Sequence, residues 1–394
     1  MRSVSEAVTS LLENSTRLVD SQEIKLMEAT GRTLATDMIA SINVPPADNS
    51  AMDGYAIRHS DCSGPETAIT LSQRITAGSV PAQLQPGTAA RIFTGAEVPA
   101  GADTVVMQEH CSEEDGAVRM LKLPPEGANI RRCGQDLASG QKVLGAGQRL
   151  RAQDLGLLAS LGIAKVQVFR RLRVAILSTG DELREPGEAI EPGQIFNSNR
   201  YTMKSQLETW GMEVVDLGVA RDDPASVRDM MLTAAMQADV VMTSGGVSVG
   251  EEDHVKAVVD ELGAIDLWRI AVKPGKPFAF GHVQGTPFIG LPGNPVSVFV
   301  TLLVIARPYL FACQGITDTV VSATRQVALF SMKETQREDY LRVRSGSGGL
   351  DLFTNQSSGV LFSTSWGDGL VRQAAGSDIR EGALVDFLPY AVFN

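Results

Sequence analysis

Cysteine and histidine are scarce in this chain of 394 residues, which contains four of each. No two cysteines form a CxxC pair, and the histidines lack the spacing of zinc ligands. So few cysteines exclude a disulfide scaffold and favour a reducing compartment. The cysteines are Cys62, Cys111, Cys133 and Cys313.

Positive charge and long hydrophobic runs are also lacking. The formal net charge of −11 disfavours binding to nucleic acid or to anionic membranes. The most apolar segment, VSVFVTLLVIA (residues 296–306), is shorter than the roughly 20 residues that span a bilayer. The N-terminus has no apolar block typical of a signal peptide. We therefore expect a cytoplasmic protein without nucleic-acid or membrane partners, in which local Lys and Arg side chains attract any anionic ligand.

Three common functional motifs are absent: the P-loop GxxxxGK[ST], the dinucleotide-binding GxGxxG and the hydrolase elbow GxSxG. What is present is the composition of an ordinary globular protein, 43% hydrophobic and 21% charged. The length suggests two to four domains.

The first 170 residues predict small elements. Apolar spacing in residues 4–30 is typical of two short helices. Short β-rich runs separated by Gly and Pro fill residues 41–140 and predict a small β domain. Residues 152–162 predict a helix, which a strand follows.

From residue 173 onward, apolar strands alternate with helices. Helices are expected at residues 201–211, 224–238 and 254–263, with a long helix that begins after Asn294. This alternation predicts a doubly wound, mainly parallel sheet. Residues 320–394 return to short strands and predict a small β-barrel or sandwich.

Polar segments stand where five strands of this sheet end. They are TGDELREPG (179–187), RDDP (221–224), SGGVSVGEEDH (244–254), KPGKP (273–277) and PGNP (292–295). Ligands of open α/β sheets bind at this edge. Ordinary connecting turns are the simpler alternative, because tight turns need glycine in any case.

The residue types in these segments suit a phosphorylated ligand. Backbone N–H groups of the SGG segment can hold an oxyanion, and Lys273 and Lys276 add positive charge. Acids beside them suggest a bridging Mg²⁺, which one or two carboxylates and substrate phosphates commonly hold. Each acid could instead be a solvated helix start, and Lys273 a surface charge.

The segment PADNSAMDGYAIR (46–58) has no apolar period and reads as a turn-rich loop. Asp53-Gly54 could be the turn of a simple hairpin. The loop could instead present Asp53 to a ligand.

Nine motifs of the chain resemble those of the molybdopterin molybdenumtransferases, the family of bacterial MoeA and the gephyrin E domain. The resemblance covers nearly the whole chain and is weakest after residue 320. The motifs are DNSAMDGYA, RIFTGAEVPAGADTVVMQE, NIRRCGQD, STGDEL, SNR, DLGVARDDP, TSGGVSVGEEDH, KPGKPFAFG and GLPGNPVS.

The resemblance implies a multidomain α/β protein of molybdenum cofactor biosynthesis. Family members take adenylylated molybdopterin and molybdate, release AMP and place molybdenum on the dithiolene, with Mg²⁺. They are elongated homodimers whose site is shared between subunits. Further expected partners are the adenylyltransferase that makes the substrate and the recipient molybdoenzymes or their chaperones.

The implied domains are an N-terminal helix associated with the α/β domain (1–20), an elongated connecting and dimerisation domain (21–45 and 141–170) and a small β-rich domain (46–140). They continue with a central doubly wound α/β domain that binds molybdopterin (171–315) and a C-terminal small β-barrel-like domain (320–394).

The family's functional residues carry over by motif. The implied catalytic residues are Asp53, Glu182, Asp222, Asp253 and Lys273, of which Glu182, Asp222 and Asp253 would hold Mg²⁺. The implied substrate-binding residues are Thr94, Arg131, Asp136, Thr179, Gly180, Ser244, Gly245, Gly246, Arg269, Lys276, Pro292, Ser297 and Ser358.

The chain departs from the family pattern in a few places. The arginine-rich loop, often RRRGED, reads RRCGQD, with Cys133 and Gln135 in place of charges. Arg269 stands where Lys is usual; it keeps the charge and can grip an oxyanion through two N–H groups. Asn355 and Gly359 stand where His is common.

Two alternatives remain at this point. An adenylyltransferase acting one step earlier would have a similar sheet, but would not need residues 41–140 with the Asp53 loop. A dimeric scaffold that binds a partner peptide would not need the acids, which are all present.

Overall fold

A computed structural model describes residues 1–246 and 254–394. The predicted metal ligand Asp253 therefore lies outside the described residues. The chain forms two compact units. The larger contains residues 1–36, 146–151 and 166–394, and the smaller contains residues 37–145 and 152–165.

The larger unit is built on a six-stranded sheet in the order β16-β13-β17-β21-β20-β18. The first four strands are parallel to one another, while β20 is antiparallel to both β21 and β18. This confirms a doubly wound, mainly parallel sheet. The strands are β13 (Arg173–Thr179), β16 (Glu213–Ala220), β17 (Val240–Ser244), β18 (Gly263–Arg269), β20 (Pro277–Val283) and β21 (Thr286–Leu291).

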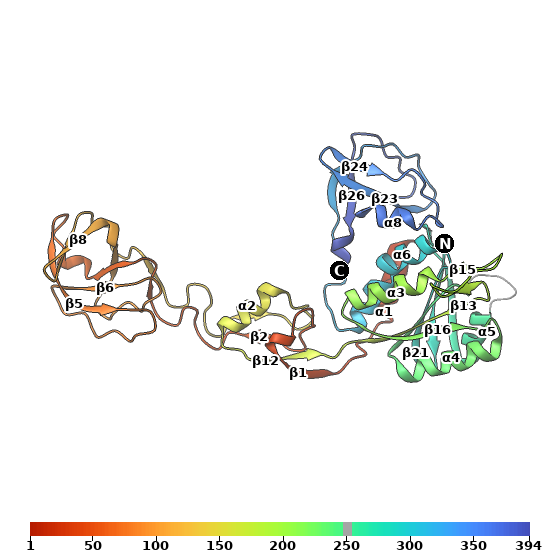
Figure 1. Cartoon of the computed structure of the whole chain (residues 1–394), viewed down its shortest axis with the longest axis horizontal. Coiled ribbons are helices and arrows are strands. Elements are labelled where there is room, and N and C mark those ends of the chain that lie inside the picture. Colours follow the sequence, from red (N-terminus) through yellow and green to blue (C-terminus); the bar gives the residue numbers. More distant parts are fainter. Residues whose placement is uncertain (247–253) are drawn as a thin grey trace. The chain divides into compact units, whose positions relative to one another are not determined.

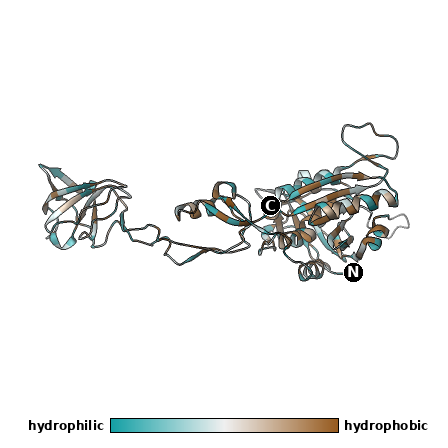
Figure 2. Cartoon of the chain, turned by 90° about the horizontal axis from the view of Figure 1, so that it is seen from below, coloured by the Kyte–Doolittle hydropathy of each residue, from teal (hydrophilic) through white to brown (hydrophobic). Residues whose placement is uncertain are grey.

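Helices cover both faces of this sheet because its central strands are apolar on both sides (Figures 1 and 2). Val174 and Ile176 of β13 pack with one set of helices, and Ala175 and Leu177 with the other. The first set is α1 (Val4–Glu13), α3 (Ser198–Thr209), α6 (Pro295–Thr301) and α7 (Arg307–Cys313); the second is α4 (Pro224–Gln237) and α5 (His254–Leu262).

The apolar segment that follows Asn294 is longer as a helix than its sequence suggested. A one-turn π-helical segment, η4 (Leu302–Ala306), joins α6 to α7, so Pro295–Cys313 is helical over 19 residues. That is long and apolar enough to cross a membrane, but 83% of its apolar window is buried inside the protein. It is therefore a core helix of the α/β layer.

All five predicted polar segments follow strands whose carboxyl ends lie at one edge of the sheet. Four of these strands are parallel, and β18 runs in their direction because both β18 and β21 are antiparallel to β20. The short strand β19 (Val272–Lys273) continues from β18 into the KPGKP segment.

The last residues form the predicted barrel-like domain within the same unit. Its sheet runs β19-β23-β25-β26-β22, and β24 pairs with the other side of β23. A bridge between Ala328 and Leu350 brings the segment after β22 back to β24 and closes the ring. The strands are β22 (Thr324–Val327), β23 (Glu338–Gly346), β24 (Gly349–Leu352), β25 (Gly369–Gln373) and β26 (Leu384–Pro389), with a short helix α8 (Phe362–Trp366).

The smaller unit contains a six-stranded sheet in the order β7-β4-β6-β5-β9-β8, as the β-rich pattern predicted. Apolar clusters pack on both of its faces. The strands are β4 (Gly54–Ile57), β5 (Ala68–Ile75), β6 (Thr88–Ile92), β7 (Thr104–Met107), β8 (Cys111–Glu114) and β9 (Ala117–Met120). The unit also contains β2 (Met38–Ile39), β3 (Asn49–Ser50), β10 (Ile130–Arg131), β11 (Lys142–Leu144) and helix α2 (Ala152–Ser160).

Two local expectations fail. The second short helix before residue 30 is instead strand β1 (Ser21–Lys25) and a single 3₁₀ turn, Leu26–Glu28. Pairing of β1 with β12 (Lys165–Phe169) satisfies its backbone, whereas so short a helix would be marginal. Asp53-Gly54 is not a hairpin turn, because β3 pairs with β10 while β4 pairs with β6 and β7.

Candidate functional site

A pocket of about 370 Å³ opens at the carboxyl edge of the α/β sheet. It gathers four residues from the predicted site: Thr179, Glu182, Ser244 and Gly245. They come from the ends of β13 and β17 and the turns that follow. The strand β15 (Ile195–Phe196), the start of α3, the start of α6 and the segment at Gly359 and Leu361 complete the walls.

Hydrogen bonds fix the walls of this pocket. The Gly245 N–H donates to the Leu291 carbonyl at 3.0 Å, which joins the turns after β17 and β21. Asn199 donates through Nδ2 to the Gly293 carbonyl at 2.8 Å. The Oδ1 atom of Asn197 accepts the backbone N–H of Arg200 and caps α3.

Two amide atoms at this wall remain without a hydrogen bond among the described residues: Nδ2 of Asn197 and Oδ1 of Asn199. Both belong to residues that line the pocket. Nδ2 of Asn197 is a donor, because Oδ1 of that residue accepts the Arg200 N–H. Oδ1 of Asn199 is an acceptor, because Nδ2 of that residue donates to Gly293. Asn199 lies in the SNR motif and Asn197 directly precedes it, but neither was predicted as a site residue from the sequence.

The acids at the edge divide into two kinds. Asp223 is structural: its carboxylate caps α4 by accepting the N–H and hydroxyl of Ser226 at 2.9 and 2.7 Å. These bonds, the backbone one first, hold the pKa of Asp223 below its ordinary value. Asp222 and Glu182 are exposed, and the Asp222 N–H donates to Oδ1 of Asp181 at 3.3 Å.

The described carboxylates at this edge do not form a closed metal site. Within residues 1–246 and 254–394, no group of three or more His, Cys, Asp or Glu side chains is placed to hold a metal ion. The donor set nevertheless suits Mg²⁺, which commonly takes one or two carboxylates and completes its shell with substrate phosphates and water. Glu182, Asp222 and Asp253 thus stay predicted ligands.

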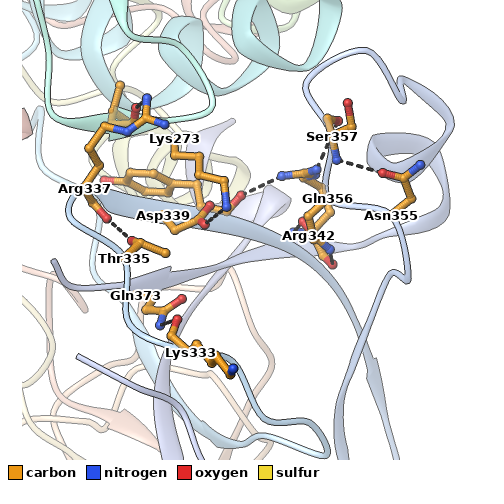
Figure 3. Close-up of polar contacts among 12 residues, drawn as sticks. Lys273, Lys333, Thr335, Arg337, Asp339, Arg342, Asn355, Gln356, Ser357 and Gln373 are labelled. Carbon is orange, nitrogen blue, oxygen red and sulfur yellow. Dashed lines mark hydrogen bonds and ion pairs between the residues drawn. The ribbon is translucent and has the colours of Figure 1, made fainter. Parts of the chain in front are cut away.

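A cluster of charges lies where KPGKP meets the C-terminal barrel (Figure 3). Nζ of Lys273 is 2.8 Å from Oδ2 of Asp339, whose side chain is only 1% exposed. Arg342, on the same strand, is completely buried. Its guanidinium donates to Ser363 Oγ at 3.2 Å and to the Tyr340 carbonyl at 3.1 Å. Burial lowers the pKa of Arg342, and the charge of Asp339 opposes that shift.

The segment NQSSG closes this cluster from the barrel side. Nη2 of Arg342 lies 3.4 Å from the Ser357 carbonyl, and Gln356 bonds the backbone of Arg342 at both N–H and C=O. The Ser358 carbonyl accepts the N–H of Val296 at 3.0 Å. The segments that carry the predicted residues Ser297 and Ser358 are therefore joined directly.

Neither Asp339 nor Arg342 was predicted as a site residue from the sequence. In the strand sequence EDYLRVRS, alternation of Leu341 and Val343 with charged residues is typical of a sheet with one solvated face. The alternation places Arg342 on that solvated face, and nothing in it indicates that Gln356, Ser357 and Ser363 would contact Arg342.

Not every predicted residue joins the pocket. Arg269 lines a separate, open pocket of about 800 Å³ with Arg2 and Trp268. Lys276 is exposed, and its carbonyl accepts the N–H of Ile270. Pro292 and Ser297 are buried beside the pocket, at the start of α6. Gly180 and Gly246 have left-handed backbone angles in the turns after β13 and β17.

In the smaller unit, the structure pairs the predicted residues Asp53 and Thr94. Oδ1 of Asp53 accepts the Thr94 N–H at 2.7 Å and its hydroxyl at 2.8 Å. These two bonds, the backbone one first, lower the pKa of Asp53 from its ordinary value. Gly54 is required next to it, because a Cβ there would lie 1.9 Å from the Val106 carbonyl oxygen. Arg91 holds the loop by donating to the Gly54 carbonyl.

The RRCGQD loop packs on the start of the DNSAMDGYA loop. The Asp48 carboxylate accepts the N–H of Cys133 at 2.7 Å and Nη1 of Arg132 at 2.6 Å. Gln135 accepts the N–H of Arg132, so it closes a turn. Cys133 donates its thiol to the Pro46 carbonyl, which gives this departure a local packing role. Arg131 and Asp136 are both exposed.

Replacing Thr94 by valine should raise the pKa of Asp53 part of the way to its ordinary value, because the backbone bond remains and the hydroxyl bond is lost. The lowered folded pKa favours the folded state above the unfolded pKa, and this contribution is lost as the pH falls through the folded pKa. In Thr94→Val this contribution should be smaller, and its loss should be complete at a higher pH, because the folded pKa is higher. NMR titration of the Asp53 carboxylate measures its pKa in the folded protein. Thr94→Ser is the control, because it keeps the hydroxyl. Equal Asp53 pKa values in the two variants would contradict the assignment.

A doubly wound sheet with a polar pocket at its carboxyl edge, beside a barrel domain that contains the buried cation Arg342, defines a multidomain α/β protein with a ligand pocket at the sheet edge. Three family models match the chain in order: the MoeA N-terminal region (domains I and II) over residues 2–162, a probable molybdopterin binding domain over residues 175–312, and the MoeA C-terminal region (domain IV) over residues 327–390. The chain belongs to the molybdopterin molybdenumtransferase (MoeA) family and is a transferase of molybdenum cofactor biosynthesis.

Individual relatives agree with this assignment. The chain is 44% identical to the molybdopterin molybdenumtransferase of Haemophilus influenzae, over 80% of this chain and 78% of the relative. It is 39% identical to that of a Nostoc species, over 75% of this chain and 70% of the relative. The crystal structure of the molybdopterin biosynthesis MoeA protein from Pyrococcus horikoshii aligns with a TM-score of 0.86 and 27% identity, over 99% of this chain and 100% of that one.

Proposed function

We propose that this enzyme inserts molybdenum from molybdate into adenylylated molybdopterin and releases AMP in a Mg²⁺-dependent reaction. The observation that carries this proposal is the pocket at the sheet edge, with Glu182 in its wall. The buried cation Arg342 of the barrel domain contacts Ser357, and the next residue, Ser358, bonds the start of α6. A phosphoanhydride and a tetrahedral dianion both need such fixed positive charge and N–H donors.

The pocket supports binding of the organic part of the substrate. Its walls combine the apolar side chains of Ile195, Phe196 and Leu361 with amide atoms of Asn197 and Asn199 that have no hydrogen-bond partner in the described part of the chain. A heterocycle that carries one acceptor and one donor would satisfy those amides, each of which otherwise costs about 1–3 kcal/mol as a buried unpaired group.

Charge neutralisation is the proposed role of the polar residues. Lys273, with Lys276 and the backbone of Ser244, Gly245 and Gly246, would bind oxyanions, and Ser297 and Ser358 would add hydroxyl donors. Arg269, Thr179, Gly180 and Pro292 are proposed substrate contacts. Glu182, Asp222 and Asp253 would hold Mg²⁺, which would neutralise charge on the phosphate oxygens and help the anhydride bond to break.

The Asp53 loop is proposed to complete the site of a partner subunit in a homodimer. Family membership supports this, since the acid of the MDGYA loop falls on Asp53. Thr94 fixes the carboxylate, and Arg131 and Asp136 of the neighbouring loop are exposed for contacts. The four unpaired cysteines fit work in a reducing, cytoplasmic compartment.

The test is AMP release from adenylylated molybdopterin with Mg²⁺, in the presence and absence of molybdate. Molybdate-dependent release, abolished by EDTA and restored by Mg²⁺, is expected. Consumption of ATP without AMP release from the preformed adenylate would instead identify an adenylyltransferase. No release under any condition would overturn the proposal.

A further inference from the structure

We propose that Asp339 is a positioning residue that holds the Lys273 ammonium in place for the oxyanion substrate. The inference rests on the proposed function, because it assumes that Lys273 meets an oxyanion. Asp339 itself would not touch the substrate.

The backbone brings the two residues together. The short strand β19 pairs in parallel with β23, and the register places Lys273 opposite Asp339. Nζ of Lys273 lies 2.8 Å from Oδ2 of Asp339. The Lys273 side chain is 37% exposed and that of Asp339 is 1% exposed. The ion pair therefore spans from the protein interior to a face that a ligand can reach.

The surroundings make Asp339 a poor candidate for a purely structural acid. Its Oδ1 atom has no hydrogen-bond partner among the described residues, and neither has Oε1 of Gln373, the residue across from it on β25. A buried carboxylate normally uses both oxygens, because each unmet bond is costly. The interaction that is formed is the one with Lys273.

The cluster of Lys273, Asp339 and Arg342 has a net positive charge, which favours binding of an anion. Figure 3 shows Lys273, Asp339 and Arg342 side by side, and the charge of Asp339 acts on Arg342. Two cations and one carboxylate leave one net positive charge. Asp339 thus allows two cations to lie close together before the substrate arrives. An ammonium has three N–H groups, so Lys273 can bond Asp339 and still donate twice to an oxyanion.

The full-length protein tests this with molybdate as the probe, measured by calorimetry, and with kcat and KM for AMP release. Asp339→Asn should bind molybdate at least about tenfold more weakly, since small misplacements of binding groups are costly. A double-variant cycle with Lys273→Met should show that Asp339→Asn adds no further loss once the amine is gone. Unchanged or tighter molybdate binding by Asp339→Asn, or an undiminished effect of it in Lys273→Met, would overturn the proposal.

Two further variants keep the test sharp. Asp239→Asn is the matched control, because Asp239 is a mostly buried carboxylate paired with Arg170 and Arg173 just before β17, at the opposite edge of the sheet. It should lower stability and leave molybdate binding unchanged. Asp339→Glu keeps the carboxylate charge but moves it by one methylene group. It replaces Asp339→Asn in the experiment if that variant does not fold. Wild-type affinity in Asp339→Glu would refute positioning. Wild-type protein that neither binds molybdate nor releases AMP would instead refute the proposed function.

Discussion

Replacement of Asp53 by alanine should reduce molybdate-dependent AMP release by about 10²–10³-fold, the loss typical when one electrostatic group of a catalytic site is removed. The folded protein should persist, because Asp53 is partly exposed and its side chain bonds only Thr94 among the described residues. Its lowered pKa keeps the carboxylate charged at neutral pH, so the variant removes a full negative charge from the site.

The measurement is steady-state AMP release, with thermal unfolding as the control for structure. Asp53→Asn tests the negative charge alone, because its amide oxygen can still accept hydrogen bonds from Thr94. We expect this variant to be nearly as inactive as Asp53→Ala. Glu126→Ala, an exposed acid of the same unit, should be fully active. An active Asp53→Ala enzyme, or a Glu126→Ala enzyme that is equally impaired, would argue against a role for this carboxylate. Mixing Asp53→Ala subunits with Lys273→Met subunits then tests sharing across a dimer, because mixed dimers would regain one intact site.

The order of elements in the α/β domain could be predicted from sequence because its signals are local. Pro224 and Asp223 mark the start of α4. Successive residues of β13 are apolar on both faces of the sheet, as is typical of a buried parallel strand. The position of the pocket could be predicted in the same way, because the polar segments that follow parallel strands lie at the same edge of the sheet. The failure before residue 30 has the opposite cause: Ser21–Lys25 is a strand only because residues 165–169, far along the chain, pair with it.

Those parts of the candidate site that depend on contacts between distant segments could not be predicted from the sequence. Lys273 was predicted because it sits in a motif, but its partner Asp339 is 66 residues away, and no local pattern links the two residues. Arg342 was missed because the alternation of Leu341 and Val343 with charged residues places it on a solvated face. That alternation describes the two faces of one strand, whereas Arg342 contacts Gln356, Ser357 and Ser363, which lie outside the strand in the same domain. Asn197 is similar: its capping bond to Arg200 could be expected, but its unpaired amide nitrogen could not.

Gly275→Ala should destabilise the protein and displace the KPGKP segment. Gly275 has φ +111°, and a Cβ there would lie 2.5 Å from Cγ2 of Thr301 on α6. The left-handed backbone costs a residue with a side chain about 1–2 kcal/mol. Overpacking against the helix costs about 1–3 kcal/mol more. Lys273 and Lys276 flank this glycine, so molybdate-dependent AMP release should also fall, by about tenfold or more.

A second glycine separates the two costs. Gly285, in the turn between β20 and β21, has φ +83°, and a Cβ there would meet no atom within 4 Å. Gly285→Ala should therefore lose only the backbone contribution and keep its activity. Thr301→Ser removes the clashing methyl and keeps the hydroxyl that bonds the Ser297 carbonyl at 2.7 Å. Combined with Gly275→Ala, it should restore stability to the level of Gly285→Ala, as measured by urea unfolding. Equal costs for the two single glycine variants would show that the helix yields, and that contact with α6 does not hold the lysines in place.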